Sequence, residues 1–434
     1  MGKASSAKSG GANATPLLCV APFFWYNGGN ELTPLYQLMT NRRNFLKSLA
    51  LLGAAATLPV QKLFAQNTAV TPKPVGEGMT KISYATDIQP ARKPPRNITI
   101  PDVGAPNGEQ YKVLKGDFHM HTLFSDGSVM PRDRVVEAVD NGLDMISITD
   151  HVEYRPNIGS TALRLAENND NHNRSYDLAK AEADNRKVIL IRGTEITKSM
   201  CHFNALFIED ANPIAAVVAD WRKMLAVAKE QGAFIFWNHP DFPSHEQLSD
   251  TVPFGYVRGT PLKFHDEIEE ARAAGLVHGI EVFNGTSYYP IVLDWCNERN
   301  LVPVTVTDIH QSDWNTYGNQ NPLRPMSLVL AKERSHDSVK EAFFAGRIVG
   351  WAANMILGRQ PWVEQLFKAS VAIERTTAGV SLKNNSDIPC FITADGRSYP
   401  LATLGATANI PGTTRFTVSN WFVGVNKPLD VVVS

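Results

Sequence analysis

The segment DFHMH, residues 117–121, ends a predicted strand over residues 115–120, and it decides how the fold is interpreted. Side chains two apart share one face of a strand, so His119 and His121 point the same way. A carboxylate, Asp126, follows within the turn Ser125-Asp126-Gly127. Alone this pair is a weak signal, because one buried histidine after a strand is more often a hydrogen-bonded core residue than a ligand. Similar strand ends elsewhere in the chain would instead indicate a metal site.

Short apolar runs alternate with amphipathic runs from residue 111 to about residue 355. The apolar runs predict strands at 144–149, 187–191, 202–208, 233–237, 279–283, 301–307 and 326–330. The amphipathic runs predict helices at 131–141, 213–231, 264–274, 291–299 and 337–345. Such alternation is typical of parallel strands with helices outside them, and roughly seven or eight such units close naturally into a barrel.

More imidazole and carboxylate groups stand at one end of these strands, the edge at which barrel enzymes keep their active sites. Together with the first strand they supply nine candidate metal ligands: His119, His121, Asp126, His151, Glu195, His202, His239, Asp308 and His310. One ion takes roughly four to six ligands, so nine donors suit two or three ions with bridging carboxylates. Imidazole combined with carboxylate favours divalent Zn, Mn or Fe over Ca or Mg.

Five motifs within residues 115–350 resemble the PHP (polymerase and histidinol phosphatase) family in their order: DFHMHTLFSDG, ITDH, GTE, NHP and DIH. The resemblance implies an α/β fold, a distorted (β/α)7 barrel with two or three metal ions. It also implies that Glu195 bridges two ions and that His119, His121 and Asp308 hold one of them. The remaining candidates would divide between the other ions. The stretch from Glu195 to His202 is shorter than in some relatives, which could alter the rim of the site.

The resemblance implies hydrolysis of a phosphate ester, by attack of a hydroxide held between two metal ions. Asp126 and Glu195 are the catalytic candidates among the ligands. Arg155, four residues after His151, is a candidate cation for the phosphate, with a surface ion pair as an equal alternative. Asp117 and Asp150 are candidates for orienting the imidazoles, and either could be purely structural.

We expect a phosphodiesterase that acts on a small phosphate ester, like an exported branch of the family that this chain resembles. A phosphomonoesterase of histidinol-phosphatase type is the second candidate, a 3′-exonuclease the third, and a non-catalytic metal-binding recognition protein a further alternative. The 42 Lys and Arg residues balance 43 Asp and Glu residues, giving a formal charge of −1. This balance supplies no general attraction to nucleic acid or to anionic lipid.

The sequence Asn41-Arg42-Arg43-Asn44-Phe45-Leu46-Lys47 precedes an apolar run at residues 48–58 that is too short to span a membrane. This arrangement resembles a bacterial twin-arginine signal, and it predicts export to the periplasm or beyond the cell. We interpret residues 39–65 as the signal, residues 1–38 as an extension ahead of a natural start at Met39, and residues 66–110 as an extended linker. No transmembrane segment is expected in the mature chain.

The rest of the 434-residue chain divides into a barrel at 111–358 and a small antiparallel β-sandwich at 359–434. Short strands are predicted at 369–375, 379–383, 389–393, 414–418 and 429–433, and no helix pattern is expected among them. The apolar fraction of 43% and the charged fraction of 20% exclude a disordered or multi-span membrane protein. A disulfide among Cys201, Cys296 and Cys390 is left open, as is the oligomeric state.

Overall fold

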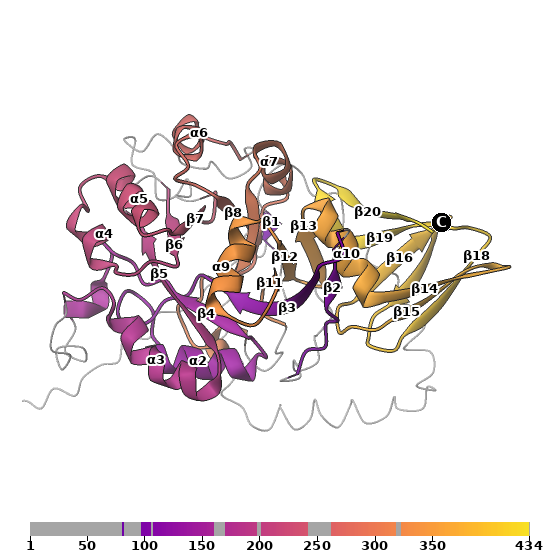
Figure 1. The fold of residues 1–434 in the computed structure, drawn as a ribbon, viewed down its shortest axis with the longest axis horizontal. Helices are drawn as coiled ribbons and strands as arrows, with labels where there is room; N and C mark the ends of the chain where they lie inside the picture. Colours follow the sequence, from indigo (N-terminus) through magenta and orange to yellow (C-terminus); the bar gives the residue numbers. More distant parts are fainter. Residues whose placement is uncertain are drawn as a thin grey trace, which may run out of the picture. The chain divides into compact units, whose positions relative to one another are not determined.

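The computed structural model describes residues 80–81, 97–105, 107–159, 170–197, 201–241, 262–317 and 323–433. The extension, the signal and most of the linker lie outside the described residues. Within the described part, a mixed α/β region is followed by a region of strands at the carboxyl end, as Figure 1 shows. Among the described helices, none is both long and apolar enough to cross a membrane.

The strands of the α/β region close into a barrel. They are β3 (Gln110–Asp117), β4 (Met145–Ile148), β5 (Ile189–Ile196), β6 (Phe203–Leu206), β7 (Phe234–Trp237), β8 (Gly279–Asn284) and β10 (Val302–Val306). Parallel pairing joins β3 to β4, β4 to β5, β7 to β8 and β8 to β10. A parallel bridge between Met120 and Ile309 then joins the segments that follow β3 and β10. β4, β7, β8 and β10 are entirely buried, as expected of strands covered on both faces.

Two strands run against the expected parallel order. β6 pairs antiparallel with both β5 and β7. β11 (Met326–Ala331) pairs antiparallel with β3 and with β12 (Ile348–Ala352). The reversal of β6 has a simple cause: only a short connection separates it from β5, and parallel neighbours need a crossover of a dozen residues or more.

Helices cover the barrel strands, and α2 (Pro131–Asp140) packs against α3 (Arg174–Arg186) (Figure 1). The helix α3 was not predicted from the sequence. The prediction of a single helix at 213–231 is wrong. The segment is divided into α4 (Asn212–Ala216) and α5 (Trp221–Glu230), because the Asp220 side chain accepts hydrogen bonds from two backbone N–H groups of α5 and caps it. The other helices are α6 (Asp266–Ala273), α7 (Ile291–Arg299), α8 (Asp313–Tyr317), α9 (His336–Phe344) and the 3-10 turn η3 (Pro156–Gly159).

A helix opens the carboxyl-terminal region, ahead of its strands, where the sequence predicted none. α10 (Gln360–Ser370) begins with Pro361 in its first turn and buries Val363, Leu366, Phe367 and Ser370 on one face. The spacing of these four residues is helical.

Two groups of antiparallel strands follow α10. The first is a three-stranded sheet of β14 (Val371–Thr376), β15 (Gly379–Asn384) and β18 (Thr407–Pro411). The second contains β16 (Cys390–Ala394), β17 (Arg397–Leu401), β19 (Arg415–Gly424) and β20 (Lys427–Val432). β17 and β18 are additional to the predicted strands. Buried side chains from both groups, including Leu382 and Val418, belong to one hydrophobic core.

The second group continues the sheet of the α/β region. β13 (Met355–Gly358) pairs antiparallel with β12 and parallel with β19, where Ile356 lies opposite Trp421. Three two-residue strands complete the fold: β1 (Thr80–Lys81) pairs with β9 (Ser287–Tyr288), and β2 (Val103–Gly104) pairs with β3. Cys296 and Cys390 are buried free thiols, and burial raises the pKa of each.

Candidate metal centre

Two chain segments meet where the barrel closes, and each carries two of the candidate ligands. The Asp308 N–H donates to the His119 carbonyl at 2.9 Å, and the His121 N–H donates to the Ile309 carbonyl at 3.0 Å. Asp308 has a φ of 53°, a left-handed backbone that bends the chain directly after β10. His119 and His121 are fully buried. The structure therefore brings the H-x-H and D-x-H motifs side by side.

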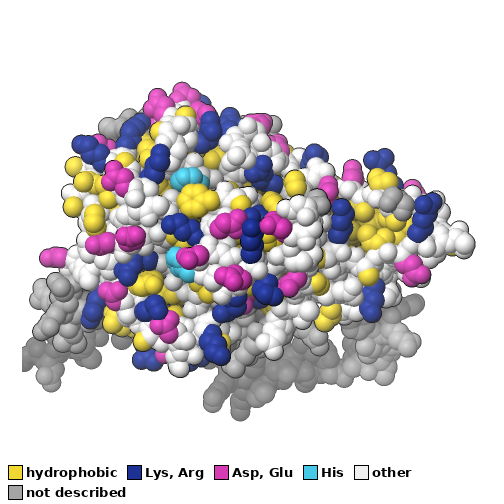
Figure 2. Space-filling model, in the orientation of Figure 1, with side chains coloured by type: hydrophobic (Ala, Val, Ile, Leu, Met, Phe, Trp, Pro, Cys, Tyr) yellow, Lys and Arg dark blue, Asp and Glu magenta, His cyan; other side chains and the backbone are white. Residues whose placement is uncertain are grey.

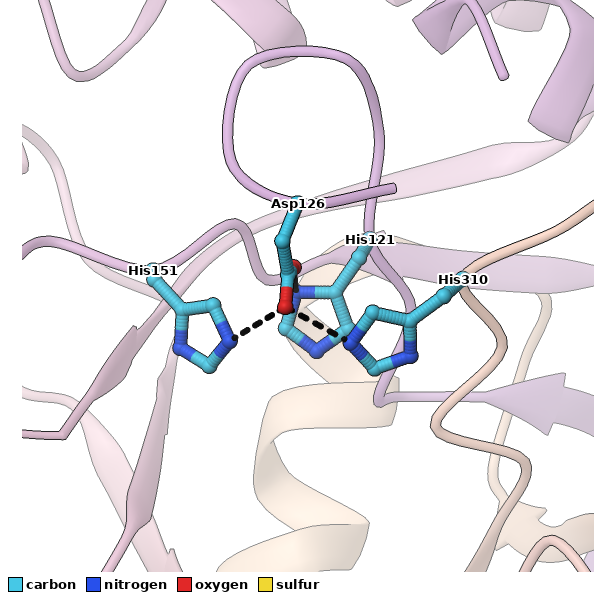
Figure 3. Close-up of side chains that lie close together, drawn as sticks. All are labelled: His121, Asp126, His151 and His310. Carbon is cyan, nitrogen blue, oxygen red and sulfur yellow. Dashed lines mark ion pairs between the residues drawn. The ribbon is translucent and has the colours of Figure 1, made fainter. Parts of the chain in front are cut away.

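Asp126 lies among three imidazoles, as Figure 3 shows. Its Oδ2 is 3.2 Å from His310 Nε2 and 3.5 Å from His151 Nε2, and its Oδ1 is 3.6 Å from His121 Nδ1. The His121 ring stacks on both other rings, with centroids 4.2 Å from His310 and 4.4 Å from His151. These four side chains present one ligand atom each within 4.8 Å of one another, close enough to surround one ion.

Glu195 lies at the centre of the remaining candidates and is fully buried. Its Oε2 is 3.2 Å from the Nε2 atoms of both His119 and His121, and 3.1 Å from His151 Nδ1. Its Oε1 is 2.9 Å from His202 Nδ1 and 3.6 Å from His239 Nε2. Because β6 is antiparallel, its first end delivers His202 to the same edge at which β5 delivers Glu195.

All nine candidates fall into four overlapping groups that could each contribute to holding an ion. Besides the group around Asp126, these are His119–His121–Glu195, His119–His239–Asp308 and Glu195–His202–His239. Two buried oxygens, Asp126 Oδ1 and Asp308 Oδ1, accept no hydrogen bond from the described residues. Unsatisfied carboxylate oxygens beside imidazole nitrogens suit divalent cations that take mixed N and O ligands. The residues present therefore fit the metal ions that the sequence leads us to expect.

The electrostatics of the site also favour bound positive charge. Burial alone would raise the pKa of Asp126, but hydrogen bonds from His151 and His310 hold it well below its usual range. Burial opposes protonation of His310, yet its hydrogen bond to Asp126 and the charge of Asp308 raise its pKa to about 9. In contrast, burial lowers the pKa of His202 to about 4. Without ions, protons on some histidines neutralise the carboxylates, and bound metal would displace them.

A carboxylate that the sequence reading did not single out supports two of the candidate ligands. Glu281 is fully buried in β8, with Oε1 2.7 Å from His119 Nδ1. Its Oε2 accepts hydrogen bonds from the His239 N–H at 2.5 Å and from Asn284 Nδ2 at 2.8 Å. Carboxylates in this position fix the orientation of a ligand imidazole and raise its basicity. The signal was available as a single charged residue within the apolar strand GIEVFN.

Asp150 was expected to contact a ligand imidazole directly, but it reaches His121 only through Ser125. It accepts hydrogen bonds from Thr122 and, at 2.6 Å, from Ser125 Oγ, which lies 3.2 Å from His121 Nδ1. Asp117 was expected to orient an imidazole, but its side chain pairs with Arg324 and with the Thr307 hydroxyl. Both carboxylates therefore act on the backbone and hydroxyl groups around the candidate ligands.

Arg155, the candidate cation for a phosphate, is half-buried beside the loop that carries Asp126. Its Nε donates to the Phe124 carbonyl at 3.1 Å. Its Nη1 lies 3.4 Å from both ring nitrogens of His172. Among the described residues, these contacts are to a backbone carbonyl and an imidazole, and no ion pair of Arg155 is seen there.

The chain is similar to one known signal family and to several solved structures. A family model of the twin-arginine translocation pathway signal sequence matches residues 39–59, so this part of the chain carries an export signal. No curated protein sequence matches at a significant score. Among solved structures, the chain is similar to PsfC from Pseudomonas syringae at 14% identity, covering 54% of this chain and 88% of that chain with a TM-score of 0.35. It is also similar to the lesion-specific endonuclease PfuEndoQ from Pyrococcus furiosus at 13% identity, covering 58% and 60%, with a TM-score of 0.35.

A much stronger likeness links the chain to a two-domain protein from Bacteroides vulgatus whose structure contains a predicted PHP-like metal-dependent phosphoesterase. The two are 34% identical, and the match covers 79% of this chain and 99% of that one, with a TM-score of 0.65. This confirms the resemblance drawn from the five motifs. The chain belongs to the PHP-like metal-dependent phosphoesterases.

Proposed function

We propose that the protein is an exported phosphodiesterase that hydrolyses a small phosphodiester with two or three divalent metal ions bound by the nine candidate ligands. The observation that carries this proposal is the position of Glu195. One of its oxygens faces His119, His121 and His151, while the other faces His202 and His239. A carboxylate with different imidazoles on each oxygen is suited to bridge two cations.

The chemistry divides between the ions and the chain. Paired divalent ions lower the pKa of water and neutralise the charge of the phosphoryl oxygens. Asp126 and Glu195 would hold the ions in fixed positions, and Arg155 would add a positive charge for the phosphate at the rim. Attack of water on phosphorus breaks the P–O bond to the leaving alcohol, which departs with a proton.

The balance of 42 Lys and Arg against 43 Asp and Glu supports a small substrate over a long nucleic acid. Figure 2 shows Lys and Arg interspersed with Asp and Glu over one face of the molecule, without a continuous stretch of positive charge on that face. Long nucleic acids are bound through such stretches. Export further separates the protein from cytoplasmic biosynthetic monoesters. We propose the catalytic domain at 111–358 and the carboxyl-terminal domain at 359–434, with the mature chain beginning near Gln66.

Hydrolysis of bis(p-nitrophenyl) phosphate and of p-nitrophenyl phosphate tests the proposal. The mature protein is stripped with a chelator and reconstituted with Mn²⁺ or Zn²⁺. We expect a higher kcat/KM for the diester. A higher value for the monoester would favour the phosphomonoesterase, and inactivity with both esters and both metals would favour the recognition protein.

Glu195→Gln tests the metal assignment itself. The amide cannot bridge two cations as a carboxylate does, so we expect metal content and activity to be lost together, with activity falling by about 100-fold or more. Glu374→Gln, on the exposed face of β14, is the matched control and should bind metal normally. A Glu195→Gln protein with full metal content and full activity would refute the assignment.

A further inference from the structure

We propose that two buried arginines, Arg134 and Arg324, are positioning residues that set the metal affinity of two different parts of the centre. Arg134 would govern the group around His310, and Arg324 the group around Asp308. This inference rests on the proposed metal assignment. It adds residues that lie outside the ligand set and contact none of its imidazole rings or carboxylates.

Arg134 links the two ligand-bearing segments through their backbone. Its side chain, from α2, is 1% exposed. Its Nε donates to the His121 carbonyl at 3.0 Å, its Nη2 to the Ile309 carbonyl at 3.1 Å, and its Nη1 to the Gln311 carbonyl at 2.8 Å. One planar group thus fixes carbonyls at His121 and on both sides of His310.

Arg324 acts at the other end of the same two segments. It is also 1% exposed, and its Nη2 pairs with Asp117. Asp117 in turn accepts hydrogen bonds from the Thr307 hydroxyl at 2.5 Å, the Thr307 N–H at 3.2 Å and the His119 N–H at 3.4 Å. Thr307 directly precedes Asp308, so this network fixes the backbone immediately before Asp308 and at the N–H of His119.

Each guanidinium has its own carboxylates, which make its burial tolerable. Arg134 Nη1 is 2.7 Å from Glu137, and Arg324 Nη1 is 2.9 Å from Asp313. Glu137 also accepts the Asp313 N–H at 3.0 Å, which connects the two networks. A buried charge that only filled space could be replaced by an apolar side chain, whereas these donors match particular carbonyls and carboxylates in direction.

The need for such fixation follows from the charges in the centre. Asp126, Glu195 and Asp308 each place a carboxylate oxygen 3.1–3.6 Å from a ring nitrogen of His121, and carboxylates crowded around one imidazole repel one another. Backbone ties that do not depend on the ions keep the donors in place beforehand. Preorganisation of this kind lowers the cost of binding, and its loss weakens metal affinity by about 10- to 100-fold.

Arg134→Lys, Arg324→Lys and the control Arg347→Lys test the inference. Lysine keeps the charge but replaces a planar set of donors by one ammonium group. Arg347 is the matched control because it is 5% exposed, donates to the Leu330 carbonyl at 2.9 Å and pairs with Glu341. It also lies over the Tyr111 ring at the start of β3, but it makes no hydrogen bond to His119, His121 or the segment 307–311, so Arg347→Lys measures the cost of disturbing a buried arginine away from the ligands.

The readout is anomalous-diffraction occupancy of Zn²⁺ or Mn²⁺ at each position, together with chelator competition on the mature protein. We expect Arg134→Lys to lower the affinity for the ion near His310 by about 10-fold or more. We expect Arg324→Lys to lower the affinity for the ion near Asp308 by about the same factor. Arg347→Lys should leave both unchanged. Wild-type occupancy in both variants, or an equal loss in Arg347→Lys, would overturn the inference. A wild-type protein that binds no ions would instead overturn the proposed function.

Hydrogen exchange on the metal-free wild-type protein keeps the inference testable if a variant does not fold. The His121 and Asp308 N–H groups form the backbone bonds between the two segments. We expect both to exchange slowly without ions, because the arginines hold the segments together. Exchange as fast as in an exposed loop would contradict preorganisation and overturn the inference.

Discussion

The His172 imidazole carries a pH response that can be separated from the candidate ligands. Burial, followed by the charge of Arg155, lowers its pKa to about 4. An unfolded histidine has a pKa of about 6.5. Between these two values the unfolded chain binds more protons at this residue than the folded chain does. The contribution of His172 to stability is therefore fully present above about pH 6.5 and is lost as the pH falls towards 4.

We predict that His172→Gln makes the protein less sensitive to acid. Thermal midpoints of wild type and variant are compared at pH 7 and pH 5. The wild type should lose more stability than the variant on acidification, because only the wild type carries this titrating imidazole. The His172 N–H bond to Asn212 involves the backbone and is retained in the variant. Equal losses in the two proteins would show that His172 is not held neutral.

At this scale the sequence predicted which side chains meet at one edge better than it predicted the residues that support them. All nine candidate ligands meet at one edge because each follows or begins a strand, and strand ends are visible in a hydrophobic pattern. Glu281 was visible only as a charge in an apolar strand. Arg134 and Arg324 gave no signal, because their partners are backbone carbonyls and carboxylates distant in sequence.

Among the elements, β5 shows how closely the strand that carries Glu195 is packed. A Cβ on Gly193 would lie 2.4 Å from Ser147 Oγ, 3.1 Å from Thr149 Cγ2 and 3.2 Å from the Ala205 carbonyl oxygen. Glycine is therefore required by space at this point, where β4 and β6 flank β5 on either side. The Ser147 hydroxyl makes no hydrogen bond with the described residues.

We predict that Gly193→Ala lowers the free energy of unfolding by about 1–3 kcal/mol through overpacking. Ser147→Ala removes the nearest atom, so the double variant should recover part of the loss. Denaturant unfolding of the two single variants and the double variant measures this coupling. Simple addition of the two single effects would mean that the Ser147 contact is not the cause.

The type of an element was predictable where its hydrophobic periodicity extended over many residues. The direction of a strand within the sheet was not predictable from that periodicity. The strand at β6 was expected, but its antiparallel direction depends on the length of the connection from β5. α10 was missed although Val363, Leu366, Phe367 and Ser370 follow helical spacing, because the β-rich segments after it dominated the interpretation. The division of α4 from α5 depends on a cap at Asp220, which resembles an ordinary exposed residue in a helical pattern.

For the whole molecule, the carboxyl-terminal strands are an integral part of the packed structure. Trp421 is fully buried opposite Ile356, and its Nε1 donates to the Pro389 carbonyl at 3.1 Å. The Asn297 side chain of α7 donates to the Val423 carbonyl at 2.9 Å. The sequence pattern changes between the two regions, but their buried side chains do not form two separate cores.

We predict that Trp421→Ala destabilises the barrel as well as the carboxyl-terminal strands, by about 3–5 kcal/mol. Chemical unfolding is followed by near-UV circular dichroism and by loss of bound metal in parallel. Both signals should shift together to lower denaturant concentration. Leu404→Ala is the control, because Leu404 is 50% exposed and its loss should have little effect. A barrel signal that does not shift would mean that the two regions unfold independently.

The bridge between Met120 and Ile309 closes the barrel beside the candidate ligands, and this position links metal binding to the stability of the fold. The barrel closes at the place where the cations would bind. A cation held there would therefore bind the folded protein and not the unfolded chain. Such a ligand contributes about 2.7 kcal/mol of stability at a free concentration one hundred times its dissociation constant. Removing the metal would thus lower the free energy of unfolding of the entire barrel, while the backbone bonds at its closure persist in the folded state, and supplying metal would restore that stability.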